Sequence, residues 1–173
     1  FRELYLSELA KKADGRVFIT DKMPHNFLHI ALLCQAFPEA KIVHVQRTAA
    51  ATCWSNFKHY FASNGLGYSY SLQDTVAYYG LYKDLMDFWV KRQYRDRIYS
   101  LDYDKLTEDQ EDETRSLIEY LELSWEDECL APQNNNRSLR TASQQQVRQK
   151  VYTGSSRAWK KYEPFLDGVF DCL

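Results

Sequence analysis

The sequence predicts an α/β protein in which a parallel sheet is flanked by helices. Three short apolar segments rich in β-branched and aromatic residues, 17–20, 41–46 and 97–101, are predicted to be strands. Longer segments with helical spacing of apolar residues alternate with them, at 26–37, 48–61, 72–91 and 108–121. This alternation is typical of parallel strands joined by right-handed helical crossovers.

The first part of the chain predicts a complete βαβ unit. A helix over residues 1–13 precedes it and ends at Asp14-Gly15. A strand at 17–20 then leads into a buried helix over 26–37, which Pro38 stops before the strand at 41–46.

The second part continues with an amphipathic helix that begins near Thr48. We expect the Thr48 hydroxyl to cap the free N–H groups of this helix, which runs to about Phe61. Its core stripe is formed by Trp54, Phe57 and Phe61, and Ser55 lies off that stripe. A terminal helix over 155–162 is anchored by Trp159.

Composition narrows the function classes. The chain of 173 residues is 45% hydrophobic, which fits a single domain with a real core. A net charge of −2 excludes an overall basic field for nucleic acid or an anionic membrane, and no apolar run of about 18 residues is present. The four cysteines form no C-x-x-C pair, so we expect no metal, and a reduced, cytoplasmic location.

Lys22 and Arg47 each follow a predicted strand directly or within two residues. Parallel strands bring their carboxyl ends to one edge of a sheet, where ligands of open α/β folds bind. The two cations therefore predict a site for one anion.

A second basic segment lies near the C-terminus. Residues 131–153 are polar and poor in large apolar side chains. This segment is longer than a loop that only connects two elements of a compact domain. Their positive charges are Arg137, Arg140, Arg148 and Lys150. We expect this loop to close over an anionic ligand, although a solvated basic loop is the open alternative.

Four motifs together resemble the sulfotransferase family that uses 3′-phosphoadenosine 5′-phosphosulfate (PAPS). They are DKMP at 21–24, Arg47 with a serine eight positions on, LDYDKL at 101–106 and TASQQQVRQKVYTGSSRAWKKYEPFL at 141–166. The pattern is most similar to bacterial sulfotransferases related to tyrosylprotein sulfotransferase, often found behind tetratricopeptide repeats. The resemblance implies a P-loop-NTPase-like fold and sulfuryl transfer from PAPS to a hydroxyl, with no metal.

The resemblance implies a role for two pairs of residues. Arg47 and Ser55 match the pair that grips the 3′-phosphate of PAPS, and a guanidinium fork suits phosphate oxygens. Lys22 and Ser143 match groups that stabilise the transferring sulfuryl group. Without the resemblance, the pattern favours a structural role for both residues, with an arginine that caps a strand end beside a buried helical serine.

Five further residues are implied to line the nucleotide. Tyr103 matches an aromatic residue near it, and a core tyrosine is the alternative. Gln146, Arg148 and Lys150 match the closing loop. His59 falls one helical turn beyond Ser55, where relatives place a second phosphate-binding arginine.

Two departures from the family pattern stand out. Arg47 is followed by Thr-Ala-Ala-Ala where relatives carry Asp-Pro, and no G-x-x-x-x-G-K-[ST] loop occurs. We therefore expect residues 1–173 to form a single sulfotransferase domain that lacks its N-terminal 5′-phosphosulfate-binding segment and general base, and that is inactive alone.

Alternatives to this function stay open. A non-catalytic module that binds nucleotide or phosphate explains the same cations. A P-loop kinase-like phosphotransferase is a weaker reading, because no Walker lysine or magnesium site is visible. The acceptor can be a peptide tyrosine, a sugar or a small molecule, since each presents a nucleophilic oxygen.

Overall fold

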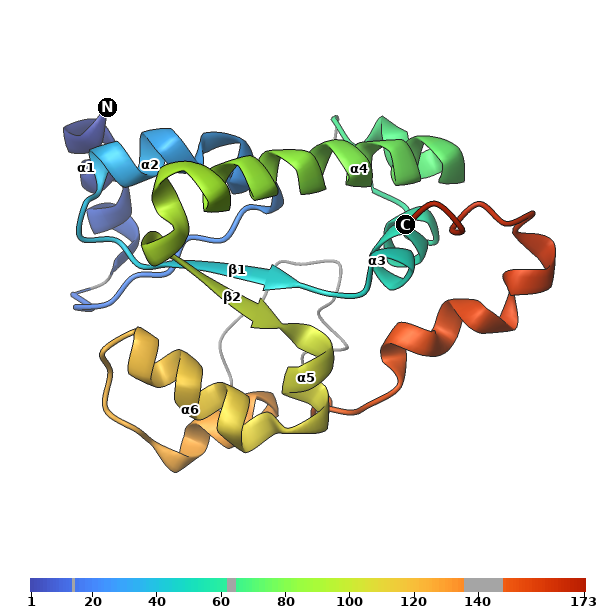
Figure 1. Cartoon of the computed structure of the whole chain (residues 1–173). Helices are drawn as coiled ribbons and strands as arrows, with labels where there is room; N and C mark the ends of the chain where they lie inside the picture. Colours follow the sequence, from blue (N-terminus) through green and yellow to red (C-terminus); the bar gives the residue numbers. More distant parts are fainter. Residues whose placement is uncertain (14, 62–64, 136–147) are drawn as a thin grey trace. The chain divides into compact units, whose positions relative to one another are not determined.

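The computed structural model describes residues 1–13, 15–61, 65–135 and 148–173 (Figure 1). Over these ranges the protein is mixed α/β and mostly helical, with one two-stranded sheet. The chain divides into two compact units. The first contains Phe1–Ile42 and Leu81–Ile98, and the second contains Val43–Gly80 and Tyr99–Leu173.

The sheet consists of β1 (Ile42–Gln46) and β2 (Ile98–Asp102), which lie side by side and run in the same direction (Figure 1). Both strands were predicted, to within one residue at each end. Because the strands are parallel, their carboxyl ends meet at one edge. The residues that follow them, Arg47 and Tyr103, therefore leave the sheet at the same edge.

The first unit has a small apolar core made by residues far apart in the sequence. Its buried members are Ile30, Cys34, Met86 and Ile98. The predicted helix over 26–37 is confirmed in part, because its first turns are the 3₁₀ helix η1 (Pro24–His29) and only α2 (Ile30–Ala36) is α-helical. The indole N–H of Trp89 donates to the Phe27 carbonyl at 2.9 Å, which ties η1 to the end of α4 (Leu72–Trp89).

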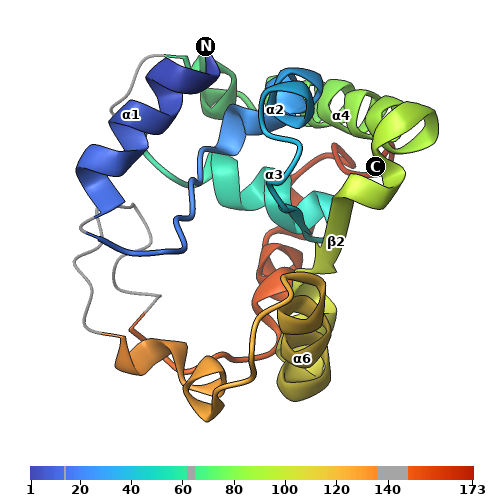
Figure 2. The same cartoon turned by 90° about the vertical axis from the view of Figure 1, so that its left-hand side faces the viewer.

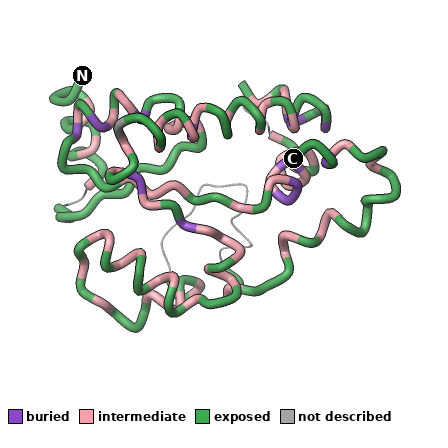
Figure 3. Tube along the Cα trace, viewed as in Figure 1, coloured by how far each residue is buried: buried purple, intermediate pink, exposed green. Residues whose placement is uncertain are grey.

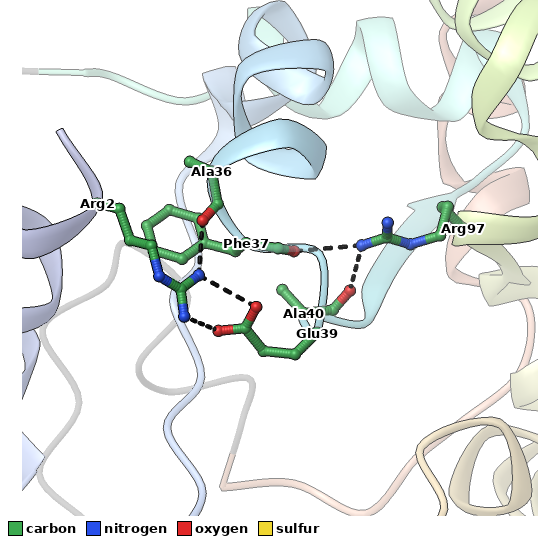
Figure 4. A network of polar contacts seen from close by, with 6 residues as sticks. All are labelled: Arg2, Ala36, Phe37, Glu39, Ala40 and Arg97. Carbon is green, nitrogen blue, oxygen red and sulfur yellow. Dashed lines mark hydrogen bonds and ion pairs between the residues drawn. The ribbon is translucent and has the colours of Figure 1, made fainter.

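A polar network joins the remaining parts of the first unit (Figure 4). From α1 (Arg2–Ala13), the guanidinium of Arg2 donates to both carboxylate oxygens of Glu39 and to the Ala36 carbonyl. Arg97 donates to the carbonyls of Phe37 and Ala40 at 3.2 and 3.1 Å (Figure 4). These bonds supply side-chain donors to the carbonyls at and just after the C-terminal end of α2, where a helix leaves its last carbonyls without partners of its own.

The predicted strand at 17–20 is wrong. These residues form no strand, and the side chains of Val17, Phe18 and Ile19 are 87%, 73% and 44% exposed. β-branched and aromatic residues favour strands only where a neighbouring strand pairs with them, and within the described ranges the sheet has two strands. Lys22 therefore does not follow a strand, and its proximity to Arg47 stays a prediction.

The second unit contains α3 (Ala49–Phe57), the first half of α4, α5 (Tyr103–Glu108) and α6 (Gln110–Tyr120). α6 lies against η5 (Asp127–Leu130) (Figure 2). The segment near the C-terminus is 3₁₀ rather than α-helical, with η7 (Ser155–Lys161) followed by η8 (Glu163–Phe165). η7 packs against α3.

Burial in the second unit centres on α3 (Figure 3). Ala50, Cys53, Leu72 and Phe170 form its buried cluster. Trp159 contacts this cluster and meets the Phe170 ring edge-on at 5.2 Å, so its predicted anchoring role is confirmed. α3 ends at Phe57, four residues before the predicted end at Phe61, and its buried residues are the small Ala50, Ala51 and Cys53 rather than the predicted aromatic stripe.

Two kinds of feature are missing from the part of the chain that the structure describes. None of the helices there combines the length and the apolar character needed to cross a membrane. The same ranges hold no group of three or more His, Cys, Asp or Glu side chains that could bind a metal ion.

Candidate anion site at the sheet edge

Arg47 is the first residue after β1 and stands two residues before α3. Its Nε–H donates to the Ser156 hydroxyl at 2.7 Å, and its Nη2 donates to the Ser155 hydroxyl at 3.0 Å. Both serines lie in the first turn of η7. The half-buried guanidinium is thus fixed on one side by two neutral acceptors.

Asp104 connects the same serine to the start of α3. Its Oδ1 accepts a hydrogen bond from the Ser156 hydroxyl. Its Oδ2 accepts from the Thr48 backbone N–H at 3.2 Å and from the Thr48 hydroxyl. One carboxylate therefore joins three segments of the chain, those at residues 48, 104 and 156.

The electrostatic setting keeps Asp104 ionised. Burial alone would raise its pKa, but the hydrogen bonds from Ser156 and Thr48, with the charge of Arg47, together lower the pKa below its usual range. A carboxylate with a depressed folded-state pKa keeps its bonds at neutral pH and loses them only when the pH falls below that range. The ionised form of Asp104 is the one that fits this network, because all of its partners there donate.

Asp102 positions the residues that carry this carboxylate. As the N-cap of α5, it accepts hydrogen bonds from the backbone N–H groups of Asp104 and Lys105 at 2.9 and 3.3 Å. These bonds satisfy N–H groups that have no partner within the helix. The cap therefore fixes the backbone of the first turn of α5, where Tyr103 and Asp104 stand.

Tyr103, in the LDYDKL motif, lies beside Arg47. The guanidinium carbon of Arg47 is 5.4 Å from the centre of the Tyr103 ring, within range of a cation–π contact. The structure thus brings two of the predicted site residues together. The nucleotide contact of Tyr103 stays a prediction.

The predicted capping role of Thr48 is wrong. Thr48 occupies the N-cap position of α3, yet its side chain makes no cap bond to that helix. Its hydroxyl donates to Asp104 instead. A cap would use the Thr48 oxygen as an acceptor of a helix N–H, whereas here the hydroxyl donates its proton to a carboxylate, and this charge-assisted bond orients the side chain.

Ser55 and His59 share one face, as their spacing predicts. The His59 Nδ1 lies 2.9 Å from the Ser55 carbonyl. Because a carbonyl can only accept, Nδ1 carries the proton in this contact. Ser55 is half-buried on α3. Phosphate binding by either residue stays a prediction.

For the other predicted site residues, a place beside Arg47 stays a prediction. Lys22 is exposed and belongs to the first unit, where Met23 takes the extended backbone expected before a proline. Arg148 and Lys150 are exposed, and Arg148 donates to the Asn135 carbonyl. Ser143 and Gln146, with Arg137 and Arg140, lie outside the described residues.

The sequence did not predict the part that four residues take in this network, namely Thr48, Asp104, Ser155 and Ser156, and it predicted a different role, a local cap, for Thr48. Three of them lie inside motifs that carry the family resemblance. Their contacts join residues more than fifty positions apart, since Ser156 and Asp104 are separated by 52 and Arg47 and Ser155 by 108. A local sequence pattern holds no signal for such pairings.

Comparison with known proteins agrees with the motif resemblance. A family model described as the sulfotransferase family matches residues 1–127, so the chain belongs to the sulfotransferase family. The chain is also 35% identical to an uncharacterized protein of Aquifex aeolicus (strain VF5), over 99% of this chain and 23% of that protein. The chain thus spans about a quarter of the length of that relative.

Proposed function

We propose that this chain supplies the 3′-phosphate-binding side of a PAPS-dependent sulfotransferase of the tyrosylprotein-sulfotransferase-like type, with a P-loop-NTPase-like fold. The observation that carries the proposal is the fixed guanidinium of Arg47 at the carboxyl edge of β1 and β2. A cation at this edge, directly before a helix N-terminus, is suited to an anionic group.

The donor inventory of Arg47 fits a phosphate. A guanidinium has about five N–H donors. Among the described residues two of them are used, by Ser155 and Ser156. About three donors remain, enough for the bidentate contact that arginine makes with phosphate oxygens. Ser55 is proposed as a further hydroxyl donor, and Tyr103 as an aromatic contact for the nucleotide.

The proposed reaction determines the roles of the other site residues. PAPS supplies an activated sulfuryl group that an acceptor hydroxyl attacks in line. We assign Lys22 and Ser143 to stabilising negative charge at the reacting end, where positioning and electrostatics provide most of the catalysis. Gln146, Arg148, Lys150 and His59 are assigned to the nucleotide. The acceptor is a hydroxyl of a peptide tyrosine, a sugar or a small molecule.

The sequence contains no glycine-rich phosphate loop of the Walker type, so the 5′ end of the cofactor needs other groups. We therefore propose that the chain alone binds the nucleotide but transfers no sulfuryl group. A nucleotide-binding role without catalysis remains the competing function for the complete protein, and it shares the Arg47 contact.

Nucleotide preference tests the proposal. We expect 3′-phosphoadenosine 5′-phosphate to bind the full chain, measured by calorimetry, equally well with magnesium and with a chelator. ATP with magnesium should bind more weakly, because it lacks the 3′-phosphate. Tighter binding of ATP that requires magnesium would contradict the proposal and favour a kinase-like phosphotransferase.

A further inference from the structure

We infer that Asp104 is a positioning residue that sets the orientation of the Arg47 guanidinium through the Ser156 hydroxyl. The inference deepens the proposed function and rests on it for its consequence on ligand affinity. Asp104 reaches Arg47 by a relay, because Ser156 donates to the carboxylate and accepts from Arg47 Nε–H at 2.7 Å.

The direction of the relay follows from the chemistry of a hydroxyl. Ser156 has one proton to donate and lone pairs to accept with. Because the carboxylate of Asp104 can only accept, the single proton must point toward it. The lone pairs of the same oxygen are then turned toward Arg47 Nε–H. The charge on Asp104 thus aligns Ser156 as an acceptor for the guanidinium.

Thr48 holds the other end of the carboxylate. Its backbone N–H and hydroxyl both donate to Oδ2 of Asp104, while Ser156 donates to Oδ1. Both oxygens therefore act as acceptors at the same time. An asparagine at position 104 offers one acceptor oxygen and one NH₂ donor, so it can satisfy Ser156 or Thr48 but not both.

The consequence is a guanidinium plane that is set before any ligand arrives. A side chain with many rotamers loses conformational freedom when it is immobilised on binding, and prior ordering removes that cost. Ser155 adds a second direct acceptor for Arg47, and among the described residues it is Ser156 and not Ser155 that bonds to Asp104. Ser156 therefore transmits the effect of Asp104, and Ser155 serves as an internal comparison.

The first arm of the test needs no ligand. The Nε–H resonance of Arg47, assigned by its loss in Arg47→Lys, reports guanidinium order through its heteronuclear NOE and its exchange with water. We expect an ordered Nε–H in the wild-type chain and a mobile, fast-exchanging one in Asp104→Asn and Ser156→Ala. Asp84→Asn, an exposed carboxylate on α4, should leave the signal unchanged.

The second arm measures affinity for 3′-phosphoadenosine 5′-phosphate. We expect Asp104→Asn and Ser156→Ala to weaken binding roughly tenfold, and Asp104→Glu to recover part of the loss. The affinity for 5′-AMP, which lacks the 3′-phosphate, should change little. A merely structural role would lower both affinities together.

The two arms separate the possible failures. An Arg47 Nε–H that stays equally ordered in Asp104→Asn would overturn the positioning role, whatever the nucleotide result. An ordered wild-type Nε–H that is lost in Asp104→Asn, with no binding of the 3′-phosphate nucleotide, would support the positioning role and reject the proposed function.

Discussion

The Nε–H of Arg47 donates to the hydroxyl of Ser156 across 109 positions of sequence. This bond joins the end of β1 to the start of η7. Because η7 packs against α3, the strand end, the helix that follows it and the C-terminal segment form one local structure. The predictions below test how that structure is held and what it binds.

The anchoring of the C-terminal segment predicts a large difference between two phenylalanines. Phe170 is 8% exposed and packs in the core of the second unit, whereas Phe165 is 81% exposed. We expect Phe170→Ala to lower the free energy of unfolding by about 3 kcal/mol, and Phe165→Ala by less than about 0.5 kcal/mol. Urea unfolding of both variants measures this, and equal losses would contradict the core assignment.

Loss of the N-cap of α5 should lower the free energy of unfolding by less than loss of the Phe170 ring. Replacing Asp102 by Ala removes the acceptor of two backbone N–H groups and should lower stability by about 1 kcal/mol. Asp102→Asn keeps an acceptor and serves as the matched control. Thermal unfolding compares the two variants. The cap assignment fails if the Asn variant is as unstable as the Ala variant.

Burial predicts that Cys53 is chemically protected. Cys53 is fully buried and its pKa is raised to about 12, mainly by burial. The nucleophile in alkylation is the thiolate, so iodoacetamide should label the exposed Cys172 at pH 8 and leave Cys53 unmodified until urea is added. Mass spectrometry of the peptides measures this, and labelling of both at one rate would contradict the packing.

The same thiol predicts a direction for stability at high pH. The folded state keeps a proton that the unfolded state loses above roughly pH 8.5, the ordinary range of a thiol. The contribution of Cys53 to the free energy of unfolding is therefore at its maximum below that pH. This contribution decreases as the pH rises toward about 12. Cys53→Ala should remove this part of the slope in urea titrations between pH 7 and 10. An unchanged slope would contradict the shift.

The sequence predicted the helices that have a long periodic pattern of apolar residues. It also predicted the strands that pair with a neighbouring strand in the structure. The helices over 1–13, 72–91 and 108–121 and the strands of the sheet agree with the structure to within a few residues. The strand at 17–20 was wrong because strand formation depends on a neighbour that a local pattern does not reveal. The helix at 155–162 is present but 3₁₀, a distinction that periodicity over two turns does not resolve.

In the candidate site, the sequence pointed to the arginine but not to the residues that hold the arginine in place. Arg47 was identified from its place at a strand end, and Tyr103 from its motif, and the structure puts them in contact. Ser155, Ser156 and Asp104 were not assigned, because their roles arise from contacts between distant segments. Thr48 was predicted to cap α3, whereas its hydroxyl donates to Asp104, a residue 56 positions away in the sequence.

The central claim is that Arg47 binds the 3′-phosphate of an adenine nucleotide. Four dissociation constants test it most directly, those of 3′-phosphoadenosine 5′-phosphate and 5′-AMP for the wild-type chain and for Arg47→Ala. We expect the substitution to weaken binding of the 3′-phosphorylated nucleotide roughly 30- to 700-fold, about 2–4 kcal/mol, and to leave 5′-AMP nearly unchanged. Equal losses for both nucleotides, or no loss for either, would contradict the claim.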